Sequence, residues 1–261
     1  MAARARSGRD GEKRGKTAAR DDRPANGDPA DSSGDEITER ICATLAEAIV
    51  NGALQPGVKL IEDVIAAHFS VSRTVVRGAI AILQRDHLVE RRRNRGAFIA
   101  EPSADDARKL FDARRALEGA VIDRVVPVAT EADIKRLHAL TYHSGHSHHH
   151  HDEKEKHELS SRFHVELAML TGNPVLVEYL EKTLARLSLV SARFGDQPEP
   201  EGCGDDEHRS LLDAIAARDT ARARREMEAH LLRIEGLVRL DADHADRNSL
   251  QAVLERFTPK D

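Results

Sequence analysis

Residues 71–83 read VSRTVVRGAIAIL and carry the pattern of an amphipathic helix. Its apolar side chains at helical spacing are Val75, Val76, Ala79, Ile80 and Leu83. Ser72 is a good N-cap, so the helix is expected to run from there to about Asp86. The exposed side of its first turns presents Ser72, Arg73, Thr74 and Arg77. The stretch therefore predicts a helix with one face in a core and a basic N-terminal end.

The flanking sequence completes a small module over residues 37–101. Apolar residues from Ile37 to Ile49 recur at helical spacing, Asn51-Gly52 ends that helix, and a short second helix follows around residues 64–69. Downstream, residues 88–90 and 97–99 have the pattern of two strands around a basic hairpin, residues 91–96. This order predicts a winged helix-turn-helix, with the helix at 72–86 placed to enter a DNA groove.

Positive charge is concentrated in this module. Between Arg73 and Arg95 there are seven arginines against Asp86 and Glu90, a balance of +5 in a chain of net charge −5. A basic module on an acidic body suits a protein that docks one end on phosphates. The alternative interpretation is a solvated basic helix beside an arginine-rich loop.

Three motifs resemble the GntR family of bacterial winged-helix regulators: GALQPG at 52–57, VSRTVVR at 71–77 and NRGAF at 94–98. The resemblance implies binding to a double-stranded DNA operator. The contacts it implies are made by Ser72, Arg73, Thr74 and Arg77 on the recognition helix and by Arg93, Asn94, Arg95 and Gly96 at the wing tip. The chain departs from the family at Gly78, usually Glu, and at Asp63, where some members have an arginine that contacts phosphate.

Residues 102–261 are predicted to form an all-α antiparallel bundle. The helical stretches after the one that starts near Ser103 are 131–142, 153–171, 174–194, 205–217, 219–240 and a short end near 248–257. FDARRALE at 111–118, Phe163-His164 ahead of Gly172, and EHR at 207–209 ahead of His230-Leu231 resemble the FCD domain of the FadR subfamily. The fold expected is mainly α. The resemblance implies that this part binds an effector and forms the homodimer.

Three histidines from three predicted helices, His164, His208 and His230, lie beside apolar stripes. Together they are candidate imidazole ligands for one divalent ion such as Zn²⁺ or Ni²⁺. The family adds an Asp one turn before the first histidine, and Ser160 stands there, so an effector carboxylate or water would complete the shell. The alternative is a metal-free pocket whose histidines bind an anion directly. Arg114 is a candidate clamp for the effector carboxylate, or the partner of Glu118 at i+4.

Two segments have biased composition. The loop at 143–151 is rich in histidine, which makes it either a metal sensor or a solvated linker. Residues 1–36 hold eight basic and eight acidic groups without an apolar period, which predicts a disordered tail. That tail is interpreted as a solvated leader, with a DNA-contacting arm as the alternative.

Composition excludes several classes. Aromatic residues make up 3% of the chain, with no Trp, which disfavours a β-sandwich or barrel; the sequence has no apolar run that could span a membrane and no signal peptide. Cys42 and Cys203 cannot form a disulfide framework, so a cytoplasmic protein is expected. No catalytic base stands beside the histidines, which favours a metabolite-responsive repressor over a metal-dependent enzyme. A metal-responsive regulator that uses the histidine-rich loop is the third interpretation.

Overall fold

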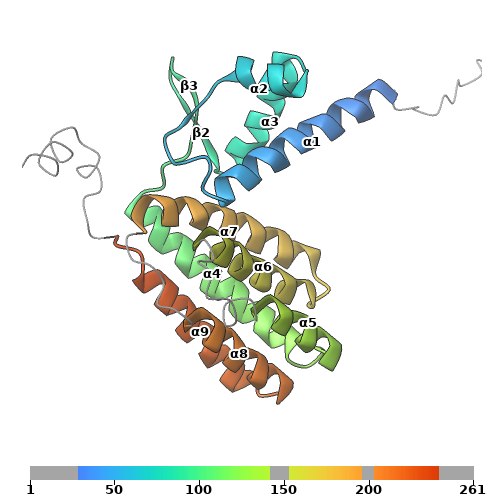
Figure 1. The fold of residues 1–261 in the computed structure, drawn as a ribbon, viewed down its shortest axis with the longest axis vertical. Helices are drawn as coiled ribbons and strands as arrows, with labels where there is room; N and C mark the ends of the chain where they lie inside the picture. Colours follow the sequence, from blue (N-terminus) through green and yellow to red (C-terminus); the bar gives the residue numbers. More distant parts are fainter. Residues whose placement is uncertain (1–28, 142–152, 196–202, 241–261) are drawn as a thin grey trace, which may run out of the picture.

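The computed structural model describes residues 29–141, 153–195 and 203–240. Two layers are visible, with a small winged module above a bundle of long helices (Figure 1). The upper module consists of α1 Pro29–Val50, β1 Lys59–Leu60, α2 Glu62–Phe69, α3 Arg73–Arg85, β2 Val89–Arg92 and β3 Gly96–Ile99. The bundle consists of α4 Ala104–Val125, α5 Glu131–Thr141, α6 Glu153–Met169, α7 Pro174–Phe194, α8 Cys203–Ala216 and α9 Thr220–Gly236. The expected mainly α architecture is confirmed.

The module on top is held by one apolar core. Its almost completely buried side chains include Ile41, Ile49, Val76, Ile80, Leu83 and Ile99. The sheet has the order β1-β3-β2 with both pairs antiparallel; Arg92 pairs with Gly96 at the wing, and Lys59 pairs with Phe98. The two-residue strand β1 was not predicted, because two residues cannot show an alternating pattern and β3 supplies all its partners.

Residue capping fixes where the main helices begin. Ser72 accepts a hydrogen bond from the Val75 amide, and Asn173 caps α7 directly before Pro174. Ser103 and Asp106 form a capping box at the start of α4, in which each side chain accepts from the other's backbone amide. These starts agree with the sequence-based expectation.

Two helix starts differ clearly from the expectation, and α9 ends at Gly236 rather than at the predicted position 240. Helix α1 begins at Pro29, inside the segment 1–36 expected to be disordered, and α8 begins at Cys203, inside a predicted break. Proline is tolerated in a first helical turn, and the half of α1 that projects away from the body in Figure 1 needs no apolar stripe. Residues 1–28, the histidine-rich loop at 143–151 and the predicted short helix near 248–257 lie outside the described residues.

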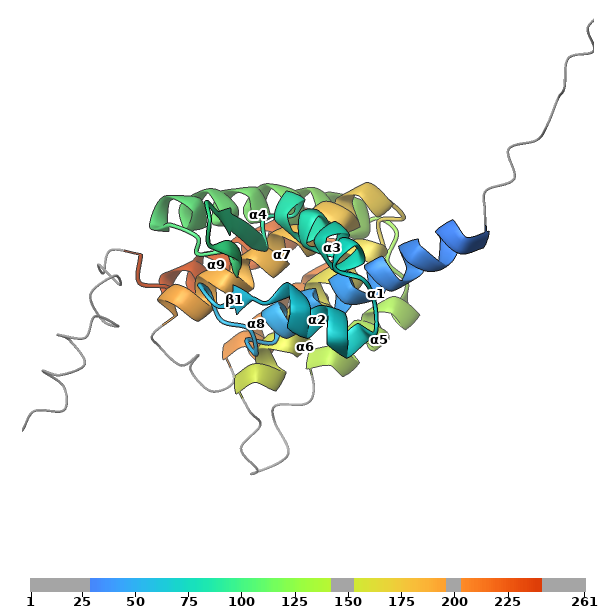
Figure 2. The ribbon, with the colours of Figure 1, turned by 90° about the horizontal axis from the view of Figure 1, so that it is seen from above.

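The winged module packs against helix α7 of the bundle. Viewed from above, α1, α2 and α3 lie over the helices of the bundle (Figure 2). In the bundle, α4 packs against α7 and α9, α8 packs against α9, and α5 packs against α6 and α8. Leu189 of α7 is buried in the core of the winged module. In the part of the chain that the structure describes, no helix has both the length and the apolar run needed to cross a bilayer.

Candidate nucleic-acid interface and histidine cluster

The first turns of α3 present an exposed polar surface. Ser72, Arg73, Thr74 and Arg77 are all exposed, whereas Val76 and Ala79 on the opposite side are completely buried. The hydroxyl of Ser72 accepts from the Val75 amide at 3.4 Å and so also holds the helix start. An exposed helix N-terminus with two arginines is the arrangement by which a recognition helix approaches base edges.

The wing is the hairpin that joins the antiparallel strands β2 and β3. Its tip residues Arg93, Asn94, Arg95 and Gly96 are exposed. Gly96 has φ +99°, a conformation that favours glycine, and Asn94 has φ +58°.

Arg92 differs from the tip arginines because it stabilises the wing base. Its Nε donates to Glu90 at 2.7 Å, it also pairs with Glu101, and its guanidinium lies 4.5 Å from the ring centre of Phe98. Because Arg92 is engaged in these contacts, the exposed arginines Arg93 and Arg95 at the tip carry the positive charge that the wing can present to DNA.

The three candidate histidines meet inside the bundle. His164 on α6, His208 on α8 and His230 on α9 are at most 4% exposed. The Nε2 atom of His230 lies 3.2 Å from the Nε2 atoms of both His164 and His208, and all three ligand atoms lie within 4.8 Å of one another. The structure thus brings together three imidazoles that are far apart in the sequence.

Two carboxylates fix the orientation of this cluster. Nδ1 of His164 lies 2.5 Å from Glu118 on α4, and Nδ1 of His230 lies 2.7 Å from Glu207 on α8. A carboxylate accepts only, so each Nδ1 carries the proton and each Nε2 presents a lone pair. Two lone pairs at 3.2 Å repel each other unless a cation lies between them.

Burial keeps His164 and His208 uncharged. Burial lowers the pKa of His164 to about 4, and Glu118 only partly opposes that shift. Burial also lowers the pKa of His208, as do the neighbouring imidazoles. Burial alone would raise the pKa of Glu118, but His164 and Arg114 hold it well below its usual range. At pH 7 both histidines are neutral, which is the form that binds metal.

Each of these carboxylates is in turn held by an arginine. Arg114 Nε donates to Glu118 at 2.6 Å, and Arg233 Nε donates to Glu207 at 2.5 Å. The structure therefore places Arg114 in the i+4 ion pair with Glu118 rather than alone in a cavity. From the sequence no role at this cluster was predicted for Arg233 or Glu207; the spacing of Arg233 three residues after His230 was the available signal.

The donor set fits a divalent metal. For Zn–N bonds of about 2.0–2.1 Å, two tetrahedral ligand atoms are separated by about 3.3–3.4 Å, close to the 3.2 Å separations observed here. The carboxylates on Nδ1 are the usual partners of metal-binding imidazoles. Ser160, one turn before His164 on α6 and partly buried, adds no carboxylate to this set.

Comparison with protein families matches both modules. Residues 37–99 match the model of the bacterial regulatory proteins of the gntR family, and residues 109–233 match the FCD domain. The chain is 28% identical over 213 residues to the HTH-type transcriptional regulator LutR of Bacillus subtilis, covering 73% of this chain and 95% of LutR. It is 26% identical over 203 residues to the HTH-type transcriptional repressor RspR of Escherichia coli, covering 78% and 89%.

Solved structures agree with this assignment. A protein from Rhodococcus sp. RHA1, assigned as a GntR transcriptional regulator, superposes with a TM-score of 0.67 at 28% identity and covers 76% of this chain and 95% of its own. E. coli McbR/YncC shares the fold with a TM-score of 0.68 at 21% identity, covering 77% and 96%. These families and relatives are regulators of transcription rather than enzymes. The chain therefore belongs to the GntR family of bacterial transcription regulators, and its FCD domain places it in the FadR-like subfamily.

Proposed function

We propose that this regulator is a homodimeric repressor whose operator affinity falls when a small carboxylate binds a divalent metal held by His164, His208 and His230. The observation that carries the proposal is the buried site in which the Nε2 atom of His230 lies 3.2 Å from the Nε2 atoms of both His164 and His208, with the Nε2 lone pairs of His164 and His230 facing each other. A bound Zn²⁺ or Ni²⁺ would supply positive charge and an open coordination position.

Charge balance indicates why the effector is an anion. Arg114 balances Glu118 and Arg233 balances Glu207, so the two ion pairs beside the histidines carry no net charge. A divalent ion then adds two positive charges that no carboxylate at position 160 offsets. A carboxylate on the effector both completes the coordination and lowers this charge.

DNA recognition supports the dimer. One winged helix reads only a half-site, and a two-fold axis supplies the second. Ser72, Arg73, Thr74 and Arg77 would contact the major groove and adjacent phosphates, while the wing tip at residues 93–96 would approach the minor groove. The sedimentation behaviour of the free protein and its stoichiometry on DNA test this arrangement.

The metal is tested by calorimetry on chelator-treated protein. We expect Zn²⁺ and Ni²⁺ to bind with one ion per chain, and the double variant His208→Ala/His230→Ala to bind neither. The variant His68→Ala, which removes an exposed histidine of α2, is the matched control. Equal metal binding by the double variant would place the metal elsewhere, including the histidine-rich segment.

The regulatory part is tested with duplexes selected by the protein from a randomised pool. A panel of mono- and dicarboxylic acids is added to the complex with and without metal. Release by a carboxylate only in the metal-loaded wild type supports the proposal, and the double variant should bind the duplex nearly as tightly but no longer respond. Release by the metal alone would instead identify a metal-responsive regulator.

A further inference from the structure

Both arginines at the start of α3 face a carboxylate of α2. Arg77 Nε donates to Glu62 Oε2 at 2.8 Å, and Arg73 forms an ion pair with the adjacent Asp63. The Glu62 side chain is 27% exposed, whereas that of Asp63 is 60% exposed. The two acidic neighbours therefore differ: Glu62 is partly enclosed and hydrogen-bonded to its arginine, and Asp63 is a solvated ion pair.

The contact with Glu62 engages only one edge of the guanidinium of Arg77. Because Nε is the donor, the two terminal amino groups remain the edge that can form parallel hydrogen bonds with guanine O6 and N7. Exposed ion pairs contribute little to folding stability, so this pair matters mainly for where the guanidinium points. Holding it before DNA arrives reduces the conformational freedom lost on binding.

The same carboxylate disfavours indiscriminate binding. Non-specific affinity comes from attraction between basic side chains and phosphates, and a negative charge beside Arg77 weakens that attraction on any sequence. When a guanine lies opposite Arg77, the hydrogen bonds between the guanidinium and the base compensate for the weaker attraction to phosphates. A positioned arginine beside a negative charge thus raises the ratio of specific to non-specific affinity.

We propose that Glu62 is a positioning residue for base recognition, which holds Arg77 for bidentate contact with a guanine and thereby sets operator specificity. This role goes beyond membership of the family and does not depend on the metal or the effector. Asp63, which has the same charge at the next position, has no such role because its own carboxylate is 60% exposed and free to move, whereas that of Glu62 is 27% exposed.

The test uses the full-length protein and two duplexes. One is the consensus recovered by the wild-type protein from a randomised pool, and the other is a scrambled duplex of the same composition. Binding is measured by fluorescence anisotropy at several salt concentrations for Glu62→Met, Glu62→Gln and the matched charge control Asp63→Asn. Met is close in size to Glu but has no oxygen acceptor, whereas Gln keeps an acceptor without the charge.

We expect Glu62→Met to lower affinity for the selected duplex about fivefold or more, the smaller end of the range for a bidentate base contact. Its affinity for the scrambled duplex should stay the same or rise. Glu62→Gln should retain most of the discrimination, and Asp63→Asn should raise affinity for both duplexes. With Arg77→Lys, which lacks a guanidinium, adding Glu62→Met should not change the ratio of the two affinities any further.

Circular dichroism and thermal unfolding confirm that each variant is folded. The proposal is overturned if Glu62→Met raises binding to both duplexes as Asp63→Asn does, because Glu62 is then only a repelling charge. It is also overturned if Glu62→Met leaves the affinity ratio unchanged, or if Glu62→Met lowers this ratio in the Arg77→Lys background as well.

Discussion

Two Arg–Glu–His triads meet at the centre of the bundle, and they differ in exposure. In the first, Arg114, Glu118 and His164 are all buried, with side-chain exposures of 7%, 1% and 0%. In the second, Arg233 and Glu207 are 21% and 28% exposed, although His230 is buried. Substitutions in the first triad should therefore affect folding, whereas those in the second should affect mainly ligand access.

Replacing Glu118 by Gln should destabilise the protein by about 3–5 kcal/mol, because it leaves the charge of buried Arg114 without its partner. Urea denaturation of the metal-free protein measures the change. Asp105→Asn, which breaks the exposed pair with Lys109, is the control and should cost less than about 1 kcal/mol. Similar losses of unfolding free energy in the two variants would show that the buried pair of Arg114 and Glu118 stabilises the fold no more than an exposed pair does.

Acid should destabilise the metal-free protein through His164. Its pKa is lowered to about 4 in the folded state from an unfolded value near 6.5, so the unfolded chain binds a proton first. Stability should therefore fall as pH decreases from about 6.5 to about 4, by about 3 kcal/mol for this group. The groups that face its ring are Glu118, Arg114, His208 and His230.

The pH dependence is measured as the unfolding free energy in the presence of a chelator. His164→Gln, which cannot titrate, should show a flatter profile over this range. Because the depressed pKa of Glu118 adds its own loss only at lower pH, the two contributions separate along the pH axis. An unchanged profile for His164→Gln would show that other groups cause the acid sensitivity.

Ser160→Asp should strengthen metal binding about tenfold or more, because a carboxylate one helical turn before His164 adds a charged oxygen ligand. Competition with a chromogenic chelator measures the affinity. Ser161→Asp, on the neighbouring position of α6, is the matched control and should leave the affinity unchanged. Equal affinities for wild type and Ser160→Asp would mean that position 160 does not face the ion.

At the scale of the element, helix α3 contains a glycine in its interior, where almost any other residue except proline would make the helix more stable. Gly78 is exposed in the middle of α3, and a Cβ there would meet only Thr38 Cγ2, at 3.9 Å. That distance is an ordinary contact. Gly78 therefore lowers the stability of the helix that reads DNA without being required by packing.

Gly78→Ala should stabilise the protein by up to about 1 kcal/mol, because alanine has a higher helix propensity and reduces the entropy of the unfolded chain. Thermal unfolding measures the gain. Gly57→Ala is the opposing control: Gly57 has φ +80° and a Cβ there would lie 3.2 Å from Glu101, so that variant should be destabilised. A lower melting temperature for Gly78→Ala would show that position 78 has no room for a Cβ atom.

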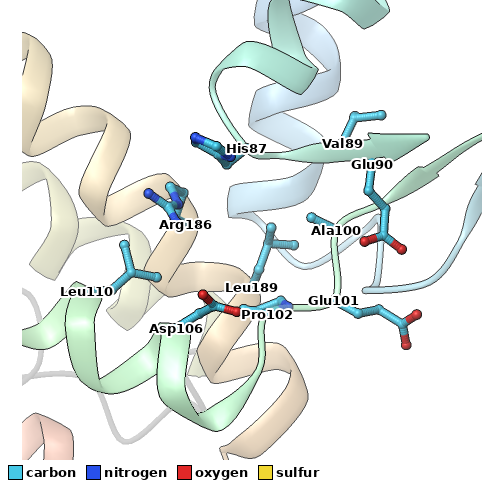
Figure 3. A pocket seen from close by; sticks show the side chains of 10 residues that line it. All are labelled: His87, Val89, Glu90, Ala100, Glu101, Pro102, Asp106, Leu110, Arg186 and Leu189. Atoms are coloured by element: carbon cyan, nitrogen blue, oxygen red, sulfur yellow. The ribbon is translucent and has the colours of Figure 1, made fainter. Parts of the chain in front are cut away.

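At the scale of the whole molecule, α7 connects the two modules. Lys182 pairs with Asp86 of the winged module at 3.2 Å, and Leu189, about two helical turns further along α7, lies in the core of that module. Beside this contact is a cavity of about 190 Å³, lined from the winged module, α4 and α7 (Figure 3). Figure 3 shows Arg186 and Leu189 of α7 below His87 and β2. The junction combines one apolar anchor with a polar, incompletely packed margin.

Leu189→Ala should cost about 2–5 kcal/mol and weaken the docking of the winged module on α7, since the side chain is 1% exposed. Calorimetry should then show the winged module unfolding before the bundle. Leu232→Ala, at a position 51% exposed on α9, is the control and should have little effect. A single transition at the wild-type temperature in Leu189→Ala would show that α7 does not anchor the module.

The sequence by itself determined the local features: the start of α3 at Ser72, the breaks at Asn51-Gly52 and Asn173-Pro174, the wing, and the bundle that follows. These depend on capping, backbone conformation and apolar spacing, all of which act within a few residues. The motifs also identified the family.

Only the tertiary structure decided which distant groups meet. The strand β1 exists because β3 offers it partners, and Glu62 reaches Arg77 because α2 packs against α3. Glu118 and Glu207 accept hydrogen bonds from Nδ1 of His164 and His230 through contacts between different helices. Such pairings depend on the relative placement of helices, which no local pattern in the chain specifies.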